Sequence, residues 1–292
     1  MPEPSFSISQ VSTLQASFAE DVDAYAAAGA DGIGIWELKL PQGADAESLA
    51  LVRDSGLAVT NCVPATPSIL PLPLLEGPVD PRERIEAVCA SIRRLAPFEP
   101  QSIVCLTGPP GGLDPGEAHR IVVDGLRRIG REAQAAGVRV GLEPIQRIGA
   151  EHWTIPTTIR EALALLDEVD DANLGLTFDV WNLWNGATLL DDIREHAPRF
   201  TGVHVADWRE PTRGWCDRVL PGDGVADVPG ILAALDEAGW RGPYDLEIFS
   251  DDGTFGNDYE GSLWRLPAQE LARRGREAFA QAWKAGKEGM RV

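Results

Sequence analysis

The chain has 292 residues, a hydrophobic content of 44% and a formal net charge of −19. Such acidity argues against the phosphate backbone of a nucleic acid as a partner. No run approaches the roughly 18 uninterrupted apolar residues of a membrane span, and the first residues lack the basic-then-apolar pattern of a signal peptide.

Short apolar runs alternate with helix-like segments along the whole chain. The runs, expected to form strands, are residues 6–10, 32–36, 58–63, 102–106, 138–143, 174–179, 202–205 and 244–249. The expected helices are residues 14–28, 46–55, 81–96, 115–136, 157–169, 190–196, 228–238 and 268–285. Asp80 and Asp114 each precede a proline, which is typical of a capped helix start, while Gly137 and Gly239 stand where helices end.

Eight such strand–helix units predict an α/β fold with a single (β/α)8 TIM barrel domain over residues 1–292. The alternative is an open, doubly wound sheet. That architecture favours a glycine-rich phosphate loop after its first strand, whereas Gly32 and Gly34 lie inside the second apolar run.

Four apolar runs carry a metal-type ligand at or near their C-terminal ends. These residues are Glu143, Asp179, His204 and Glu247. In a barrel, all C-terminal strand ends open onto one face, so the four side chains are expected on a common rim. Three carboxylates and one imidazole suit one divalent cation, with Mn2+ preferred and Mg2+, Co2+ or Zn2+ as alternatives. The alternative interpretation is that these four residues form hydrogen bonds at the rim and bind no metal.

The sequences around these ligands resemble a known superfamily. The motifs are Gly-Leu-Glu-Pro-Ile at 141–145, Thr-Phe-Asp-Val at 177–180, Gly-Val-His-Val-Ala-Asp at 202–207 and Leu-Glu-Ile-Phe at 246–249. They are similar to the sugar phosphate isomerase/epimerase superfamily of xylose isomerase-like TIM barrels. The resemblance implies that Glu143, Asp179, His204 and Glu247 hold the metal, and that Glu143 and Glu247 also flank the reacting carbons as catalytic residues.

The predicted function is therefore that of a divalent-metal-dependent isomerase or epimerase of a keto-sugar or sugar derivative. It would remove a proton next to a metal-polarised carbonyl group. Many relatives carry histidines where this chain has Gln146 and Asn182. Together with a surplus of rim tryptophans, this leaves open the large subunit of a C-glycoside deglycosidase. That enzyme eliminates an aromatic aglycone from a 3-oxo-C-glucoside and assembles with a small β-rich subunit. A non-catalytic sugar-binding barrel is the second alternative.

Several further residues are candidates for contact with a sugar or glycoside substrate. Arg218 precedes a Pro-Gly-Asp-Gly turn, where the resemblance places a substrate-binding arginine; Arg209 is a weaker candidate. The alternative interpretation is that Arg218 lies on the surface and pairs with Asp207 or Asp217. Aromatic walls suit the apolar faces of sugars. The predicted substrate-binding set is Arg218, Gln146, Asn182, Trp36, Trp181 and Trp208, and further tryptophans near strand ends are Trp153, Trp184 and Trp215.

Three polar residues near the predicted rim complete the expected site. His152 lies in the loop after the Glu143 strand and is a candidate acid/base residue. Glu37 is expected to contact His204 without binding the metal itself, and Asp207 is expected to support the same metal centre in a similar way. His119 and His196 are expected to be solvated on polar helix faces.

The remaining expectations concern the environment of the protein. Four cysteines without CxxC spacing predict buried, reduced thiols in a cytoplasmic protein; they are Cys62, Cys89, Cys105 and Cys216. The protein is expected to form a homo-oligomer, or a hetero-oligomer with a small β-rich subunit.

Overall fold

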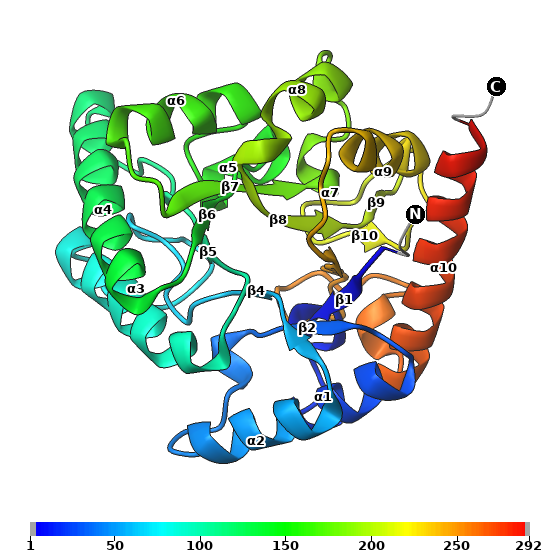
Figure 1. The fold of residues 1–292 in the computed structure, drawn as a ribbon. Helices are drawn as coiled ribbons and strands as arrows, with labels where there is room; N and C mark the ends of the chain where they lie inside the picture. The colour runs from blue at the N-terminus through cyan, green and yellow to red at the C-terminus, as the bar shows by residue number, and fades with distance from the viewer. Residues whose placement is uncertain (1–3, 290–292) are drawn as a thin grey trace.

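The computed structural model describes residues 4–289. Its main sheet has nine strands in the order β3-β2-β1-β11-β8-β7-β6-β5-β4, and all neighbouring pairs are parallel (Figure 1). The strands are β1 Phe6–Ser9, β2 Gly32–Gly34, β3 Ala58–Val59, β4 Asn61–Cys62, β5 Ser102–Cys105, β6 Val140–Leu142, β7 Leu174–Asp179, β8 Phe200–Val205 and β11 Tyr244–Leu246.

Thr60 closes this sheet into a barrel. It lies between β3 and β4, the two ends of the strand order. The Thr60 N–H donates to Ile33 O at 3.0 Å, and Thr60 O accepts from Ser102 N at 3.3 Å. Because β3 and β4 are two halves of one run, the barrel has eight strand segments. The predicted (β/α)8 barrel is therefore confirmed.

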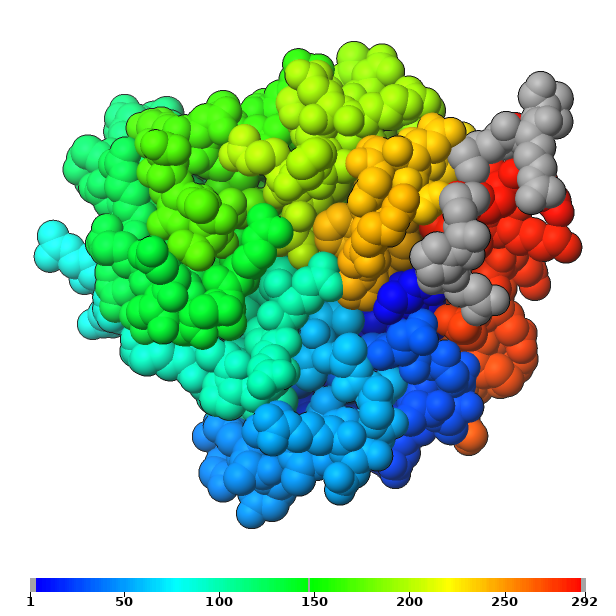
Figure 2. All heavy atoms as spheres, viewed as in Figure 1, coloured from blue at the N-terminus to red at the C-terminus, as the bar shows by residue number. Residues whose placement is uncertain are grey.

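The helices surround the barrel in chain order. They are α1 Phe18–Ala27, α2 Asp45–Ser55, α3 Pro81–Leu95, α4 Pro115–Ala136, α5 Arg147–Trp153, α6 Ile159–Val169, α7 Val180–Leu183, α8 Leu189–His196, α9 Val228–Glu237 and α10 Ala268–Gly289. The colours in Figure 2 follow one another around the molecule, and α10 packs against both α1 and α9. Within residues 4–289, no helix combines the length and hydropathy needed to cross a membrane.

The helix expected over residues 14–28 begins later than predicted. The 3-10 helix η1 occupies Gln10–Thr13, and α1 starts at Phe18. Ser17 caps α1 by a capping box with Glu20, in which each side chain accepts the other residue's backbone N–H. The apolar residues before Ser17 therefore belong to a separate turn. Two short helices at the C-terminal ends of the strands, α5 and α7, were not expected.

Small residues inside the barrel leave room for polar side chains from other strands. A Cβ on Gly202 would lie 2.2 Å from Asn61 Oδ1, and a Cβ on Gly141 would lie 2.1 Å from Thr177 Oγ1. Both positions therefore require glycine. The interior below the strand ends is consequently more polar than the branched aliphatic layers usual in such barrels.

Candidate metal centre and its pocket

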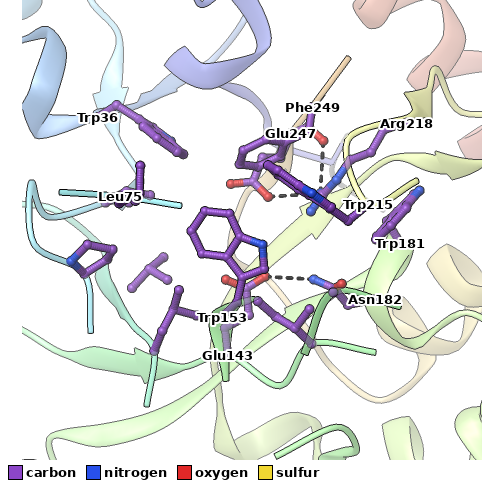
Figure 3. Close-up of a pocket in the computed structure, with 16 residues that line it drawn as sticks. Trp36, Leu75, Glu143, Trp153, Trp181, Asn182, Trp215, Arg218, Glu247 and Phe249 are labelled. Atoms are coloured by element: carbon purple, nitrogen blue, oxygen red, sulfur yellow. Dashed lines mark hydrogen bonds and ion pairs between the residues drawn. The ribbon is translucent and has the colours of Figure 1, made fainter. Parts of the chain in front are cut away.

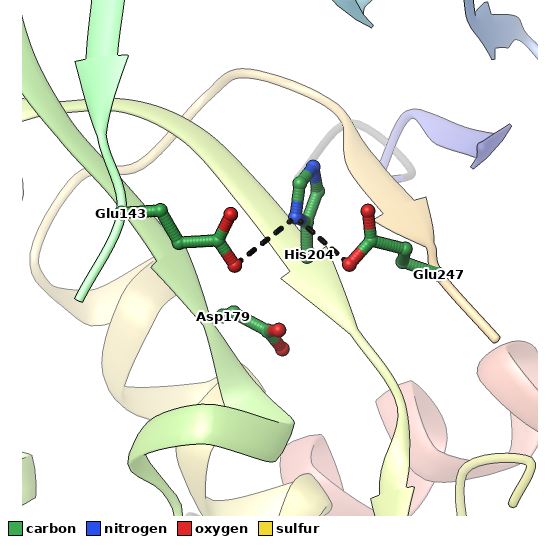
Figure 4. Close-up of side chains that lie close together, drawn as sticks. All are labelled: Glu143, Asp179, His204 and Glu247. Atoms are coloured by element: carbon green, nitrogen blue, oxygen red, sulfur yellow. Dashed lines mark ion pairs between the residues drawn. The ribbon is translucent and has the colours of Figure 1, made fainter. Parts of the chain in front are cut away.

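Four buried side chains converge at the C-terminal end of the barrel (Figure 4). Glu143 follows β6, Asp179 ends β7, His204 lies in β8 and Glu247 follows β11. These four strands are consecutive in the sheet, so their C-terminal ends are neighbours. One potential ligand atom from each residue lies within 4.8 Å of the others.

Two other side chains connect these groups into a ring. Asn182 Nδ2 donates to Glu143 Oε1 at 3.2 Å and to Asp179 Oδ2 at 2.7 Å. Arg218 Nη1 lies 3.0 Å from both Asp179 Oδ2 and Glu247 Oε2. His204 Nδ1 completes the ring, 3.3 Å from Glu247 Oε2 and 3.9 Å from Glu143 Oε1.

The donor set fits a divalent cation in two respects. First, His204 Nδ1 faces the two glutamates, yet neither of its buried ring nitrogens forms a hydrogen bond within residues 4–289. Once the imidazole has lost its extra proton, this nitrogen and the facing carboxylate oxygens would bind one metal ion between them. Second, three carboxylates and the Arg218 guanidinium together leave two negative charges, which a divalent cation would balance.

Burial and charge perturb the titration of these groups. The pKa of Asp179 is raised to about 7, chiefly by burial; Glu143 and Glu247 also raise it, while Arg218 and His204 lower it. Burial lowers the pKa of His204, but the carboxylates of Glu247 and Glu143 outweigh this and hold it well above its usual value. Burial likewise opposes ionisation of Glu247, but His204 and Arg218 outweigh it and lower the pKa of Glu247. The metal-free site therefore holds protons that a cation would displace.

A cavity with a volume of about 60 Å³ opens beside the ring (Figure 3). Its polar lining comes from Glu143, Asn182, Arg218 and Glu247. The rest of the lining is apolar or aromatic and consists of Trp36, Val63, Pro67, Leu75, Val104, Leu106, Ile145, Gly149, Trp153, Trp181, Trp215 and Phe249. The candidate metal centre thus forms one end of an apolar pocket.

Four of the six predicted substrate-binding residues line this cavity: Trp36, Trp181, Asn182 and Arg218. Arg218 is buried against Asp179 and Glu247, so the alternative of a surface arginine paired with Asp207 or Asp217 is wrong.

Gln146 and Trp208 lie outside the lining of this cavity. Gln146 Nε2 donates to Trp181 O at 2.7 Å. Trp208 packs behind Trp181, with a distance of 4.8 Å between ring centroids, and also against Trp184. Both residues therefore support the wall that Trp181 presents to the cavity.

His152 is not among the residues that line the cavity. It lies on α5 with a partly exposed side chain, and its Nε2 is 3.5 Å from Glu151 Oε1. The structure does not bring it to the metal centre as an acid/base residue, because the short helix α5 turns this side chain away and directs Trp153 to the cavity instead.

Glu37 and Asp207 organise the rim rather than the metal centre. The expected contact between Glu37 and His204 is not present, since Glu37 accepts hydrogen bonds from Ala65 N and Arg94 Nη1. Asp207 is occupied by four backbone N–H groups, those of Trp208, Gly222, Gly224 and Ala226. Asp207 therefore fixes the loop that follows the short strand β9 (Asp207–Trp208).

The predicted substrate-binding set omits three prominent side chains of the pocket wall, although Trp153 and Trp215 were among the tryptophans expected near strand ends. Phe249 lies two residues beyond Glu247, a spacing that puts both on the same side of an extended chain, so its position could have been inferred. Trp153 belongs to α5, and Trp215 belongs to the segment between β9 and β10 (Arg218–Val219). The strand pattern does not specify the paths of these two segments.

Comparison with known proteins places these features in a family. The family model described as "Xylose isomerase-like TIM barrel" matches residues 22–282. The chain is 27% identical over 265 residues to a 3-dehydroshikimate dehydratase of Pseudomonas aeruginosa, covering 84% of this chain and 38% of that protein. It is 29% identical over 153 residues to an L-ribulose 3-epimerase of Methylomonas sp., covering 51% of this chain and 49% of that protein. The chain thus spans about half or less of the length of these relatives.

A similar solved structure is that of protein SMc04130 from Sinorhizobium meliloti 1021. The TM-score is 0.83 at 27% sequence identity, and the match covers 95% of this chain and 98% of that one. The whole barrel is therefore shared with that protein.

Proposed function

The chain belongs to the xylose isomerase-like TIM barrel family, and we propose that it is a divalent-metal-dependent isomerase or epimerase of a keto-sugar or sugar derivative. The proposed reaction begins with removal of a proton from the carbon next to a carbonyl group. The epimerase and isomerase names among its relatives agree with this chemistry.

One observation carries the proposal. Among the described residues that line the cavity, the ionisable ones are Glu143, Arg218 and Glu247. An arginine stays protonated under working conditions and is a poor proton carrier. Proton transfer in the cavity therefore falls to the two glutamates, which also belong to the metal-ligand group.

Two carboxylates on opposite sides of the substrate suffice for the reaction. One glutamate removes the proton as a general base, and the other returns a proton to the opposite face or to the neighbouring carbon. When bound, a divalent cation supplies a Lewis acid that polarises the carbonyl group of the substrate. Arg218 offers its positive charge to the oxygen on which negative charge develops, and the apolar wall excludes water.

We propose manganese as the resident cation. Carboxylate oxygens are hard ligands, and a single imidazole with three carboxylates suits Mn2+, with Mg2+, Co2+ and Zn2+ as competitors. Titration of the metal-stripped protein with each ion, followed by activity measurement, ranks them.

Deuterium exchange tests the proposed proton removal without requiring the substrate to be converted. The Mn2+-loaded protein is incubated in D2O with a panel of keto-sugars, and loss of the proton next to the carbonyl group is followed by NMR. Exchange is expected with at least one sugar, and it should stop on chelation of the metal. The Glu143→Gln and Glu247→Gln variants should lose it, while Glu151→Gln, altered at an exposed glutamate, should retain it. Exchange that persists in both active-site variants would refute the proposal.

An elimination reaction is the second candidate, and the dehydratase name of one relative favours it. The same base would remove the proton, after which a group on the next carbon would leave. This includes release of an aglycone from a 3-oxo-C-glucoside by a deglycosidase large subunit with a small β-rich partner. Product analysis separates the reactions, because an epimerase releases no fragment.

We propose a homo-oligomer for the isomerase or epimerase and a hetero-oligomer with the small β-rich subunit for the elimination enzyme. Sedimentation of the protein by itself, and after co-expression with such a subunit, distinguishes the two.

A further inference from the structure

We propose that the substrate carries a flat apolar group, such as an aromatic ring, beside its metal-binding oxygens, and that Trp153 and Trp215 select for this group. This inference rests on the proposed function for the metal-binding end of the substrate. It concerns only which substituent the rest of the cavity accepts, whatever bond is later made or broken.

The first argument is the separation of polar and apolar lining. The polar residues Glu143, Asn182, Arg218 and Glu247 all belong to the ring of ligand contacts. No other described residue that lines the cavity offers a charged, amide or hydroxyl side chain. Away from this end, a substrate therefore meets carbon surface.

The indole N–H groups of Trp36 and Trp181 do not change this character. The Trp36 Nε1–H is already used, because it donates to Ser9 Oγ at 3.1 Å. The Trp181 Nε1 atom is buried in the protein and has no hydrogen-bond partner within residues 4–289. Neither indole offers a donor to a sugar hydroxyl, so both contribute ring faces and edges.

The aromatic rings form one continuous wall. Trp36 packs edge-on against Phe249 with 5.7 Å between centroids, and Trp215 lies 5.9 Å from Phe249. Trp215 in turn meets Trp153 at 5.3 Å, again edge to face. This wall connects two otherwise separate apolar clusters, one around Trp36 and one around Trp153, through Trp215. A planar apolar group can replace ring-to-ring contacts along such a wall.

The segment that carries Trp215 is held in place before a ligand arrives. Buried Asp217 pairs with Arg209 and Arg213 on the same segment, and Arg213 also stacks 4.3 Å from the centroid of the Tyr259 ring. Such a segment presents Trp215 with little ordering cost on binding.

The wall discriminates between two kinds of substrate. A free keto-hexose carries a hydroxyl on nearly every carbon, and each hydroxyl buried here without a partner should cost about tenfold in affinity. An aromatic substituent gains apolar burial and ring contacts at the same place. The geometry therefore favours a conjugated keto-sugar over the free sugar.

Paired ligands test this inference. Binding of the methyl and phenyl glycosides of one 3-oxo-hexose, in which the carbonyl group stays free, to the Mn2+-loaded protein is measured by quenching of intrinsic tryptophan fluorescence. The phenyl glycoside is expected to bind at least about tenfold more tightly in the wild type. This ratio should fall below about threefold in Trp215→Leu and in Trp153→Leu, because each variant removes one side of the aromatic wall.

Trp184→Leu is the matched control, since Trp184 is also half-buried but packs against Trp208 outside the cavity. It should keep the wild-type ratio, and Mn2+-dependent stabilisation shows that each variant is folded. Equal affinity for both glycosides in the wild type, binding of neither, or an unchanged ratio in both cavity variants would overturn the inference. Deuterium exchange reports separately on the proposed function: a preference for phenyl without exchange would sustain the pocket assignment and reject the isomerase or epimerase.

Discussion

Metal uptake by this protein should release about two protons per ion at pH 6 and fewer at pH 8. Burial raises the pKa of Asp179 to about 7, so this carboxyl group of the metal-free protein is mostly protonated at pH 6 and mostly ionised at pH 8. Burial lowers the pKa of His204, but the nearby glutamates outweigh this and hold it well above its usual value, so its imidazole carries a second proton at pH 6. At pH 6 a divalent cation at the ring would displace both protons and leave the net charge of the site unchanged.

The size of the effect follows from the two protons. Between pH 8 and pH 6 the ionised fraction of Asp179 falls about tenfold, so this group alone should lower the metal affinity about tenfold. Competition with the proton on His204 should lower the affinity further. The sign is fixed by Asp179: its folded-state pKa lies above the ordinary 3.8, so lower pH favours the proton over the metal.

Calorimetry in buffers of different ionisation enthalpy measures this proton release directly. Asp179→Asn is the informative variant, because it removes one titrating group and retains a carbonyl oxygen. It should bind the cation more weakly and release about one proton at pH 6. Release of about one proton or fewer from the wild type at pH 6, or equal release by the wild type and the variant at pH 6, would refute the assignment of protons to this site.

Three further predictions concern stability and reactivity. Asp207→Ala should lower the free energy of unfolding by about 3–5 kcal/mol in urea titrations, because four backbone N–H groups lose their acceptor, whereas Asp223→Ala at the exposed turn should change it little. Gly141→Ala should lower the free energy of unfolding by about 1–3 kcal/mol, because the new Cβ would lie 2.1 Å from Thr177 Oγ1. Adding Thr177→Ala to this variant should restore part of the lost stability in thermal melts. Ellman's reagent should find no reactive thiol in the native protein and four after denaturation, from Cys62, Cys89, Cys105 and Cys216; rapid reaction of the folded protein would contradict their burial.

The barrel and the ligand group could be predicted from the sequence for a simple physical reason. A buried parallel strand is apolar, so Asp179 or His204 within such a run signals a compensating partner. The carboxyl ends of consecutive strands meet at one edge of the barrel, so four such residues in successive strand–helix units indicate one site. No knowledge of the loops is needed for this step.

The surroundings of the site could not be predicted in the same way, because loops decide them. Glu37 lies three residues beyond the end of β2, at the start of a 3-10 helix, and its carboxylate accepts hydrogen bonds from Arg94 and Ala65 rather than contacting His204. His152 and Trp153 are adjacent in sequence, but α5 directs only Trp153 to the cavity. Which neighbour faces inward depends on the helix phase, and the strand alternation contains no information about it.

The position of Asn182 clarifies how this site differs from that implied by the family resemblance, which places a histidine there. The amide Nδ2 group bridges Glu143 and Asp179 through two hydrogen bonds without adding charge. A protonated imidazole at the same point would bring a second positive charge beside Arg218 and would weaken the attraction for a divalent cation. The amide therefore preserves the two net negative charges that a divalent cation would balance. Because an amide cannot carry a proton near neutral pH, the proposed acid/base work would fall to Glu143 and Glu247.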